Sequence, residues 1–360
     1  MLNRLLQAVP GFSVRVGECA SVEAAADQFF ECSAEHEAPL MRPVNYREMD
    51  QVFMKILPSI PVPRTFRAII HGGRVLDEGV VLSKDGRLLR EVCVANGYSP
   101  TEHPYANRRA VARTRKLRGR TAVAASRGGD CYYHWIFDVL PRLGLIEGEF
   151  RDALLIQNSV GYQQESLAML GCNDVIPCGR GKHFACEELL LPSLSGTCGM
   201  PTPLSCNFLR EKFVSEVKGT PDRLIYISRE DSSNRRVSNE SELLALLRPM
   251  GFEKHVLTGM NFASQVDLFA SASVVVAPHG ASLTNLVFCN PNTAVLELFH
   301  PAYFHWCYWF ICACSGLRYA YGIPGGSPAI RHDPAHSKTP IYADIPSVEK
   351  LLTAFLDKQQ

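Results

Sequence analysis

The alternation of short apolar runs with helical segments between Leu224 and Phe299 constrains this chain more than any other feature. Residues 274–276 are three consecutive valines, a run without polar alternation that is typical of a strand covered on both faces. Similar runs lie at 224–227, 255–257 and 294–299. Because short connections join strands and helices in alternation, we expect a parallel sheet with right-handed crossovers and hence an α/β fold.

The segments between these runs carry signals of helix ends. Asn239 is a preferred N-cap residue, and Glu242 completes a capping-box pattern for a helix that ends before Gly251. Asn261 introduces a second helix, expected over 265–272. A third, expected over 282–288, follows the valine strand almost directly. The alternation therefore predicts four strands and three helices in this half of the chain.

The turn Pro278-His279-Gly280-Ala281 joins the valine strand to the third helix. Ligands of open α/β sheets bind beyond the carboxyl ends of the strands, and a helix N-terminus there suits an anion. We therefore expect an anion site at this turn. The alternative is a structural turn in which His279 hydrogen-bonds only the backbone.

Other polar residues also fall at expected strand ends. Ser228 and Arg229 follow the first strand, Arg235 and Arg236 lie in the next loop, and Glu297 lies within the fourth strand. Arginines form bidentate pairs with a diphosphate, and a buried glutamate would suit the hydroxyl pair of a ribose. The alternatives are an exposed loop pair at 235–236 and a structural salt bridge for Arg229. No GxGxxG or Walker pattern supports a dehydrogenase or a P-loop enzyme.

A second constellation lies at 132–143, where His134, Asp138 and Arg142 are spaced four residues apart and share one helical face. The opposite arc is apolar, and Pro141 is expected to kink the helix and free a carbonyl near Phe137. A histidine and an aspartate one turn apart form a workable general base. The alternative is a solvated polar face on which Asp138 pairs with Arg142.

Composition excludes several classes of protein. The 360 residues suggest about two domains, and a net charge of +1 argues against a nucleic-acid binder. The 13 cysteines form no CxxC pair, and we find no secretory signal or membrane-length apolar run. We therefore expect reduced thiols in a cytoplasmic protein, with no metal site built from cysteine.

Two segments leave open a contact with a membrane. Eight cations and no acid lie between Asn107 and Arg127, which suits a solvated loop or a contact with anionic lipid or a phosphorylated acceptor. The aromatic run 303–316 is expected to be a core or interdomain helix, the alternative being a peripheral membrane contact at the inner face of the membrane. Residues 218–221 are the candidate linker.

Five segments in order, HWIFDVLPRL (134–143), YISR (226–229), the pair Asn239-Glu240, APHGASLTNLVF (277–288) and VLELF (295–299), resemble glycosyltransferase family 61. The resemblance covers about Gly129 to Phe299. It implies a GT-B-like architecture, with two Rossmann-like domains facing a central cleft. It divides the chain into an acceptor-side α/β domain (1–217), a nucleotide-sugar-binding domain (218–340) and a C-terminal helix (341–360) that packs back on the first domain.

The resemblance also implies an inverting, metal-independent transfer of a sugar from a nucleotide-diphosphate donor, a UDP-sugar above all, to a saccharide hydroxyl. The acceptor would be a saccharide or lipid-linked saccharide of cell-surface or capsular polysaccharide, and no cofactor or metal is expected. By analogy the site residues are His134 and Asp138 for catalysis, Tyr133 and Arg142 on the acceptor side, and, for the donor, Ser228, Arg229, Arg235, His279, Gly280, Ala281 and Glu297.

Three questions remain open at this stage. The base is Asp138 or the His134–Asp138 pair, and a swap that makes His279 the base is an alternative. An inactive nucleotide-sugar- or carbohydrate-binding protein of the same fold is an alternative to the enzyme. A hydrolase that uses His134 and Asp138 is a third interpretation.

Overall fold

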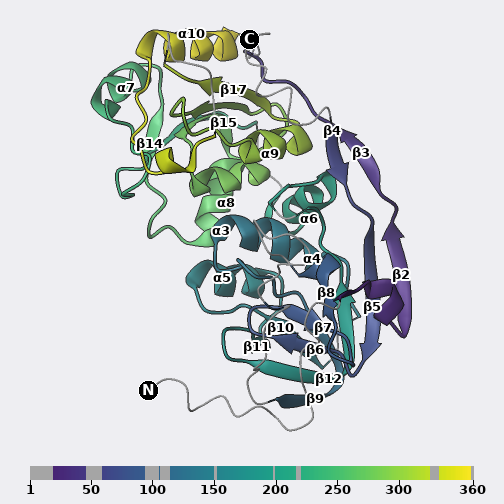
Figure 1. Cartoon of the computed structure of the whole chain (residues 1–360). Helices are drawn as coiled ribbons and strands as arrows, with labels where there is room; N and C mark the ends of the chain where they lie inside the picture. Colours follow the sequence, from purple (N-terminus) through teal and green to yellow (C-terminus); the bar gives the residue numbers. More distant parts are fainter. Residues whose placement is uncertain are drawn as a thin grey trace. The chain divides into compact units, whose positions relative to one another are not determined.

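The chain divides into two compact units, which Figure 1 colours along the sequence. The first comprises residues 1–36 and 61–200, and the second comprises residues 37–60 and 201–360. The computed structural model describes residues 19–45, 59–93, 105, 114–149, 152–197, 199–215, 220–324 and 332–357. The sequence placed the boundary at residue 217, whereas helix α6 (Pro203–Phe213) already lies in the second unit. Residues 218 and 219 of the expected linker lie outside the described residues.

The second unit is built on a five-stranded sheet in the order β14-β13-β15-β16-β17, and all neighbouring strands are parallel. The α/β class and the parallel sheet are therefore confirmed. The strand expected at 255–257 begins two residues earlier, and the last strand is one the sequence pattern did not predict. The strands are β13 (Arg223–Ile227), β14 (Glu253–His255), β15 (Ala272–Pro278), β16 (Ala294–Leu298) and β17 (Arg318–Gly322).

Helices cover the second unit's sheet on both faces (Figure 1). Val274, Val276 and Leu296 share a core cluster with α7 and α10. The sequence predicted that α10 packs on the first domain, but its residues Val348 and Leu352 are buried in this cluster of the second unit. The helical elements are α7 (Glu240–Leu247), α8 (Phe262–Ala270), the 3-10 helix η3 (Ala281–Phe288), α9 (Cys307–Ser315), the 3-10 turn η4 (Pro334–His336) and α10 (Ile345–Leu356).

Helix α9 contains most of the aromatic run expected at 303–316. Its residues Trp309, Phe310 and Ile311 are at most 2% exposed, and the helix ends at Gly316 in the left-handed conformation that favours glycine. Most of the run is therefore a core helix, as the first of the two interpretations expected. No helix in the described part of the chain is long and apolar enough to span a bilayer.

An N-terminal segment completes the second unit. The backbone N–H of Val44 donates to the carbonyl of Tyr319, and the side chain of Asn45 bonds both backbone groups of Tyr321. Close by in the sequence, β3 (His36–Pro39) and β4 (Ser59–Val62) form a two-stranded sheet. Sequence periodicity does not reveal the contacts of Val44 and Asn45 with β17, because they join residues more than 270 positions apart.

The first unit contains a ten-stranded mixed sheet. β12, β9, β10 and β11 run parallel side by side, and β1 runs parallel to β8, while β5, β6, β7 and β8 also form antiparallel pairs. The Rossmann-like expectation therefore describes only part of this unit. The strands are β1 (Cys19–Ala20), β2 (Gln28–Ser33), β5 (Thr65–His71), β6 (Arg74–Leu76), β7 (Val80–Leu82), β8 (Leu88–Leu89), β9 (Arg115–Val123), β10 (Ala153–Ile156), β11 (Ile176–Pro177) and β12 (His183–Pro192).

One helical stretch of the first unit changes type along its length. It runs through α3 (Tyr132–His134), a π-helical turn η2 (Trp135–Val139) and α4 (Leu140–Gly144). Pro141 lacks an N–H group and crowds the preceding turn, which accounts for the wider turn before it. The freed carbonyl of Phe137 accepts a hydrogen bond from Ser195 Oγ at 3.3 Å, so the expected consequence of Pro141 is confirmed. The remaining helices are α1 (Val22–Ala25), η1 (Arg90–Val92) and α5 (Gly161–Met169).

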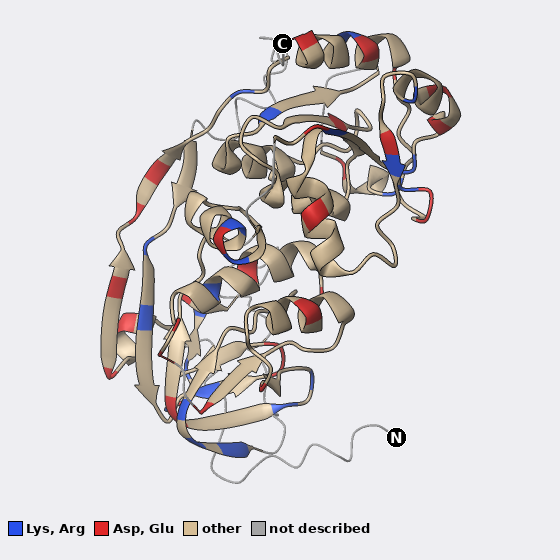
Figure 2. Ribbon diagram, turned by 180° about the vertical axis from the view of Figure 1, so that it is seen from behind, with Lys and Arg blue, Asp and Glu red and all other residues tan. Residues whose placement is uncertain are grey.

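Charged residues of both signs are interspersed over the ribbon of each unit (Figure 2). The first half of β9 is basic, with Arg115, Lys116 and Arg118 exposed, while Arg120 pairs with Glu188. Other members of the basic stretch, Arg108, Arg109 and Arg113, lie outside the described residues.

Candidate functional site

A buried histidine–glutamate pair lies at the carboxyl ends of β15 and β16. The parallel register sets Ala277 beside Glu297, and the backbone N–H of His279 donates to the carbonyl of Leu298. Nδ1 of His279 is 2.5 Å from Oε1 of Glu297, and Tyr319 donates its hydroxyl to Oε2 at 2.8 Å. Both carboxyl oxygens of Glu297 are thus bound to protein groups. The structure therefore gives Glu297 a role in holding His279, and not the expected contact with a ribose.

Burial determines the protonation of this pair. It raises the pKa of Glu297 well above its usual value and lowers the pKa of His279 well below its own. Both shifts favour the neutral pair, in which the proton between the two groups belongs to Glu297 and the imidazole carries its other hydrogen on Nε2. In that state His279 is a hydrogen-bond donor, which suits an anionic oxygen better than it suits a base.

Two arginines lie beside this turn. Arg229 follows β13 and donates to Ser232 Oγ and to the carbonyl of Asn234, while Arg235 donates from Nε to the carbonyl of His279 at 2.9 Å. Neither arginine is in an ion pair among the described residues. Burial, and then the charge of Arg235, lowers the pKa of Arg229. Two partly buried cations without a carboxylate partner form a site that an anion would stabilise.

Position 280 is occupied by glycine, and the Arg229 side chain lies too close to it to leave room for a Cβ atom. Its backbone is extended, with φ 174°, a conformation open to any residue. A Cβ atom at this position, however, would lie 2.6 Å from Cζ of Arg229 and closer still to Nη1. Ala281 begins η3, which is a 3-10 helix and not the α-helix that the sequence predicted. Ser282, which the sequence analysis did not select, has a buried hydroxyl with no partner among the described residues.

Ser228 is engaged within the second unit. Its hydroxyl donates to Oε1 of Glu240 at 2.6 Å and accepts from the backbone N–H of Glu230. Tyr226 donates to the same Glu240 oxygen, and Lys254 donates to the other. Ser228 therefore belongs to a polar network that ties β13 to α7, and the expected donor contact is not available to its hydroxyl. Glu240 was visible in the sequence only as part of the Asn239-Glu240 motif.

The capping box expected at 239–242 is not formed. The Asn239 side chain accepts from the backbone N–H of Ala343 and donates to its carbonyl, each at 2.9 Å, and donates to Glu242. No side-chain cap hydrogen bond is made to the helix. Asn239 instead pairs with a distant strand-like segment, which local spacing does not predict.

The second candidate centre, in the first unit, is the His134–Asp138 pair. Nδ1 of His134 lies 2.6 Å from Oδ2 of Asp138, and the backbone N–H of Gly199 donates to Oδ1 at 3.3 Å. Asp138 is 4% exposed, whereas the His134 side chain is 21% exposed. The expected one-turn pairing is formed, with the histidine as its accessible member.

Two glycines border the far edge of the His134 ring. A Cβ atom at Gly128 would meet Cδ2 of the ring at 3.6 Å, and one at Gly199 would meet Cε1 at 3.9 Å. Because Nε2 lies between these two ring carbons, the glycines leave room on the Nε2 side. Tyr133, the predicted acceptor-side residue, donates its hydroxyl to the carbonyl of Gly199 at 3.0 Å and so helps to position this edge.

Arg142 does not share the exposed face with His134. It is fully buried, and its guanidinium donates to the carbonyls of Ala124, Ala125 and Pro192. Burial lowers its pKa to about 10. Arg142 therefore links the end of β9 to the end of β12 through hydrogen bonds. Because its side chain is fully buried, an acceptor cannot reach it, and the predicted acceptor contact is wrong for this residue.

Aromatic and histidine side chains surround His279 in a cluster that the sequence analysis missed. The His279 ring stacks on Phe299 at 5.0 Å, and Tyr303 packs between His279 and the Arg235 guanidinium. Burial lowers the pKa of His305 to about 4. Clustering arises because the loops after β16 and before η4 converge, which spacing alone does not show. Further members are Tyr308 and His332, and His300 and His336 stack on each other.

No metal centre is evident in the described ranges, where no group of three or more His, Cys, Asp or Glu side chains is placed to hold an ion. The cysteines in these ranges are free thiols, and most are buried. Metal independence stays a prediction.

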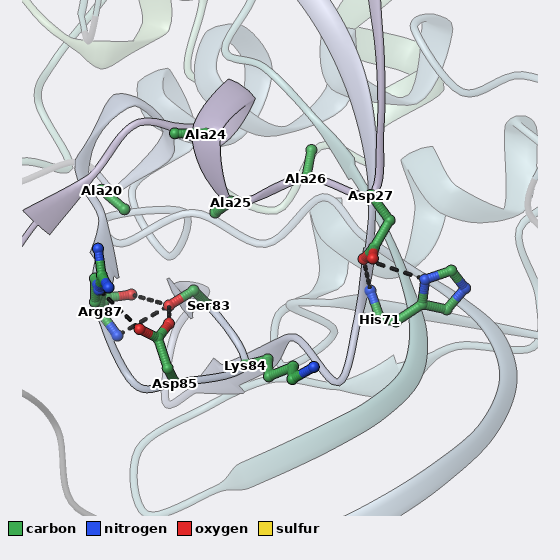
Figure 3. A pocket seen from close by; sticks show the side chains of 10 residues that line it. All are labelled: Ala20, Ala24, Ala25, Ala26, Asp27, His71, Ser83, Lys84, Asp85 and Arg87. Carbon is green, nitrogen blue, oxygen red and sulfur yellow. Dashed lines mark hydrogen bonds and ion pairs between the residues drawn. The ribbon is translucent and has the colours of Figure 1, made fainter.

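A polar depression of about 390 Å³ lies elsewhere in the first unit (Figure 3). Most of its charged side chains are paired with one another, and the backbone N–H of His71 lowers the pKa of Asp27. No predicted site residue lines it. The polar lining consists of Asp27, His71, Ser83, Lys84, Asp85 and Arg87.

A model of the Glycosyltransferase 61 family matches residues 132–296, from the first residue of α3 into β16. Residues 132–296 belong to glycosyltransferase family 61. The resemblance stated from the sequence motifs is thereby confirmed. The matched segment holds His134, Asp138, Arg229, Arg235 and His279, and Glu297 follows it directly.

Two family 61 relatives support this assignment. A rice protein (Oryza sativa subsp. japonica), beta-1,2-xylosyltransferase RCN11, is 26% identical over 213 residues, which are 50% of this chain and 40% of the relative. A cattle protein (Bos taurus), protein O-linked-mannose beta-1,4-N-acetylglucosaminyltransferase 2, is 35% identical over 99 residues, 26% of this chain and 17% of the relative. This chain therefore spans less than half the length of either relative.

Proposed function

We propose that this protein is a glycosyltransferase that moves a sugar from a nucleotide-diphosphate donor to a saccharide hydroxyl. The observation that carries the proposal is the convergence of Arg229 and Arg235, without a carboxylate partner among the described residues, on the turn at Gly280. Charge-assisted hydrogen bonds from guanidinium groups are the usual way to hold a diphosphate and to stabilise it as it leaves. Membership of family 61 supports the same activity.

In this proposal the second unit binds the donor. Arg229 and Arg235 hold the diphosphate, and His279 donates from Nε2 to a phosphate oxygen because Glu297 keeps the imidazole neutral and oriented. Since the relatives are named for xylosyl and N-acetylglucosaminyl transfer, UDP-xylose and UDP-N-acetylglucosamine are the first donors to test.

The first unit supplies the base. Asp138 is almost fully buried and both of its oxygens accept hydrogen bonds, so His134 is the better candidate to take the proton, on Nε2. The acceptor oxygen attacks the anomeric carbon as its proton passes to His134. The bond from that carbon to the diphosphate oxygen breaks, and the electron pair leaves with the nucleoside diphosphate. A single displacement of this kind inverts the anomeric centre.

The finer predictions from the family resemblance belong to the same proposal. They are the GT-B architecture, transfer without a metal, and a role in cell-surface or capsular polysaccharide synthesis. The cytoplasmic location expected from the sequence, with a contact at the inner face of the membrane as its alternative, also stays part of the proposal. An inactive protein that only binds nucleotide-sugars is the alternative.

Release of nucleoside diphosphate from a panel of nucleotide-sugars, with and without saccharide acceptors, tests the proposal. Acceptor-dependent release supports transfer, and acceptor-independent release indicates a hydrolase. Binding without release in either condition would favour the inactive alternative. Replacement of Arg229 by Gln should lower donor affinity about tenfold or more, and unchanged affinity would remove its assigned role.

A further inference from the structure

Three polar side-chain atoms of the first unit are buried just beyond β9 and β10 without a partner. The atoms are Ser126 Oγ, Arg127 Nη1 and Asn158 Oδ1, and none has a hydrogen bond within the part of the chain that the structure describes. Ser126 is only 1% exposed. A buried polar group without a partner costs free energy, so three of them together need an explanation beyond the folding of the chain.

The topology places these side chains near one another. β9 and β10 are parallel neighbours with Val123 opposite Leu155, and Ser126 and Asn158 each follow three residues later. Both therefore lie at the carboxyl edge of the same sheet, where α/β proteins bind ligands. Gly128, the residue after Arg127, lies against the His134 ring. The loop that carries Ser126 and Arg127 therefore continues to the proposed base.

Two buried glutamines hold the loops that carry these groups. Gln157 donates from Nε2 to the carbonyl of Ser126 at 2.5 Å, and Gln163 donates to the carbonyl of Gly129 at 3.0 Å. Oε1 of Gln163 also accepts from the backbone N–H of Ser159 at 2.7 Å. The backbone of both loops is therefore fixed by the glutamines, and the side chains of Ser126, Arg127 and Asn158 are left over for another partner.

The chemistry of the unused groups indicates what that partner is. A guanidinium is permanently charged, and Arg127 is in no ion pair among the described residues, so an anionic oxygen is its best partner. Hydroxyl and amide side chains such as those of Ser126 and Asn158 bind the hydroxyl groups of sugars. A neutral saccharide would leave the guanidinium uncompensated, whereas an acidic one satisfies all three groups.

We infer that the loops after β9 and β10 bind an acidic saccharide, with Arg127 on its carboxylate or phosphate and Ser126 and Asn158 on its hydroxyls. The inference rests on the proposed function, because it specifies the acceptor for that reaction. It also gives Arg127, one cation of the basic stretch recognised in the sequence, a function distinct from that of the exposed arginines of β9.

Titration of the full chain with glucose, glucuronate and glucose 6-phosphate, followed by NMR, tests the inference. Tighter binding of glucuronate indicates a carboxylate ligand, and tighter binding of glucose 6-phosphate indicates a phosphate ligand. Arg127→Gln should weaken binding of the acidic sugar about tenfold. Arg118→Gln, which removes an exposed charge from β9, is the matched control and should change little. The inference would be overturned if glucose bound as tightly as the two acidic sugars. It would also be overturned if Arg127→Gln bound the acidic sugar as tightly as the unmodified protein does.

Stability measurements provide a second readout. Since the fold does not use Ser126 Oγ, Ser126→Ala should leave Tm unchanged or slightly higher. Ser166→Ala should instead lower Tm by several degrees, because Ser166 Oγ accepts from Trp135 and donates to a backbone carbonyl. A loss of Tm in Ser126→Ala as large as that in Ser166→Ala would make Ser126 structural and contradict the inference.

Binding of UDP separates this inference from the proposed function. Arg127→Gln should bind UDP as the unmodified protein does, because the donor residues lie on other elements. If neither UDP nor any other nucleoside diphosphate binds the unmodified protein, the proposed function fails. The saccharide titration would still decide whether the Arg127 subsite exists.

Discussion

The guanidinium of Arg229 occupies the space into which a side chain at Gly280 would project. The two residues come from different strand ends of the second unit, β13 and β15, and their contact aims the arginine at the turn that follows His279. Glycine is needed here for space and not for backbone freedom, since φ of Gly280 is extended. The pair therefore connects the sequence pattern His279-Gly280-Ala281 to the placement of a positive charge.

Gly280→Ala is expected to displace Arg229 without unfolding the protein. The atoms in the way belong to the end of a flexible side chain, so the guanidinium can shift, and alanine tolerates the extended backbone. We expect UDP affinity to fall about tenfold or more, because a charge-assisted contact is lost, while Tm changes little. Calorimetry and thermal unfolding measure the two effects. Gly179→Ala is the control, since nothing lies within 4 Å of its new Cβ. Unchanged UDP affinity in Gly280→Ala would argue against Arg229 as a diphosphate ligand.

His134→Gln is expected to lower turnover about 100-fold or more, because loss of a general base removes a rate acceleration of that order. Donor affinity should stay the same. Asp138→Asn should also lower turnover, since the amide cannot stabilise the protonated ring as the carboxylate does. Steady-state kinetics and UDP calorimetry on both variants measure this. If His279→Gln, and not His134→Gln, abolishes turnover with donor affinity intact, the roles of the two histidines must be exchanged.

Arg142→Lys is expected to destabilise the protein by about 2 kcal/mol or more, because an ammonium cannot reach the three carbonyls that the guanidinium bonds. Denaturant unfolding measures the change, with Arg248→Lys, at an exposed residue that caps the C-terminus of α7, as the control. Activity per folded molecule should be preserved at low temperature. If Arg142→Lys instead raised the KM for the acceptor and left the stability unchanged, Arg142 would be an acceptor contact after all.

His305 is expected to make stability depend on pH. Its pKa is about 4 in the folded protein and about 6.5 in the unfolded chain, so the unfolded chain binds more protons as pH falls. The contribution of neutral His305 to the free energy of unfolding is therefore fully present above pH 6.5. It is lost as the pH falls from 6.5 to 4, by about 3 kcal/mol in total. His305→Asn can keep the acceptor for the backbone N–H of Cys307 and removes the titration. The free energy of unfolding of the variant should vary less over this window than that of the unmodified protein. Parallel curves would show that burial does not depress this pKa.

Local sequence patterns predicted most of the second unit, because each depends on residues close together in the chain. The valine run of β15 is buried on both faces as its composition requires, and His134 meets Asp138 because a helical turn brings residues four apart together. Pro141 freed the Phe137 carbonyl for the same local reason.

Contacts between distant residues were beyond local patterns. The sequence predicted that Glu297 binds a ribose. In the structure the register of β15 and β16 brings His279 to one carboxyl oxygen of Glu297, and Tyr319 of β17 binds the other. Ser228 lost its predicted role to Glu240 for the same reason. A side chain with polar atoms can satisfy them on the protein or on a ligand, and the sequence does not say which.

By itself, the sequence determined the parallel α/β sheet, the turn at His279 and Gly280, the His134–Asp138 pair and the resemblance to family 61, since these reside in periodicity and short motifs. Only the tertiary structure decided that Arg142 is a buried strand connector and that Glu297 orients His279. It also decided that Ser126 Oγ, Arg127 Nη1 and Asn158 Oδ1 have no hydrogen-bond partner among the described residues. The physical reason is that burial and hydrogen-bond partners depend on which distant strand ends meet, and that is settled only when the sheets assemble.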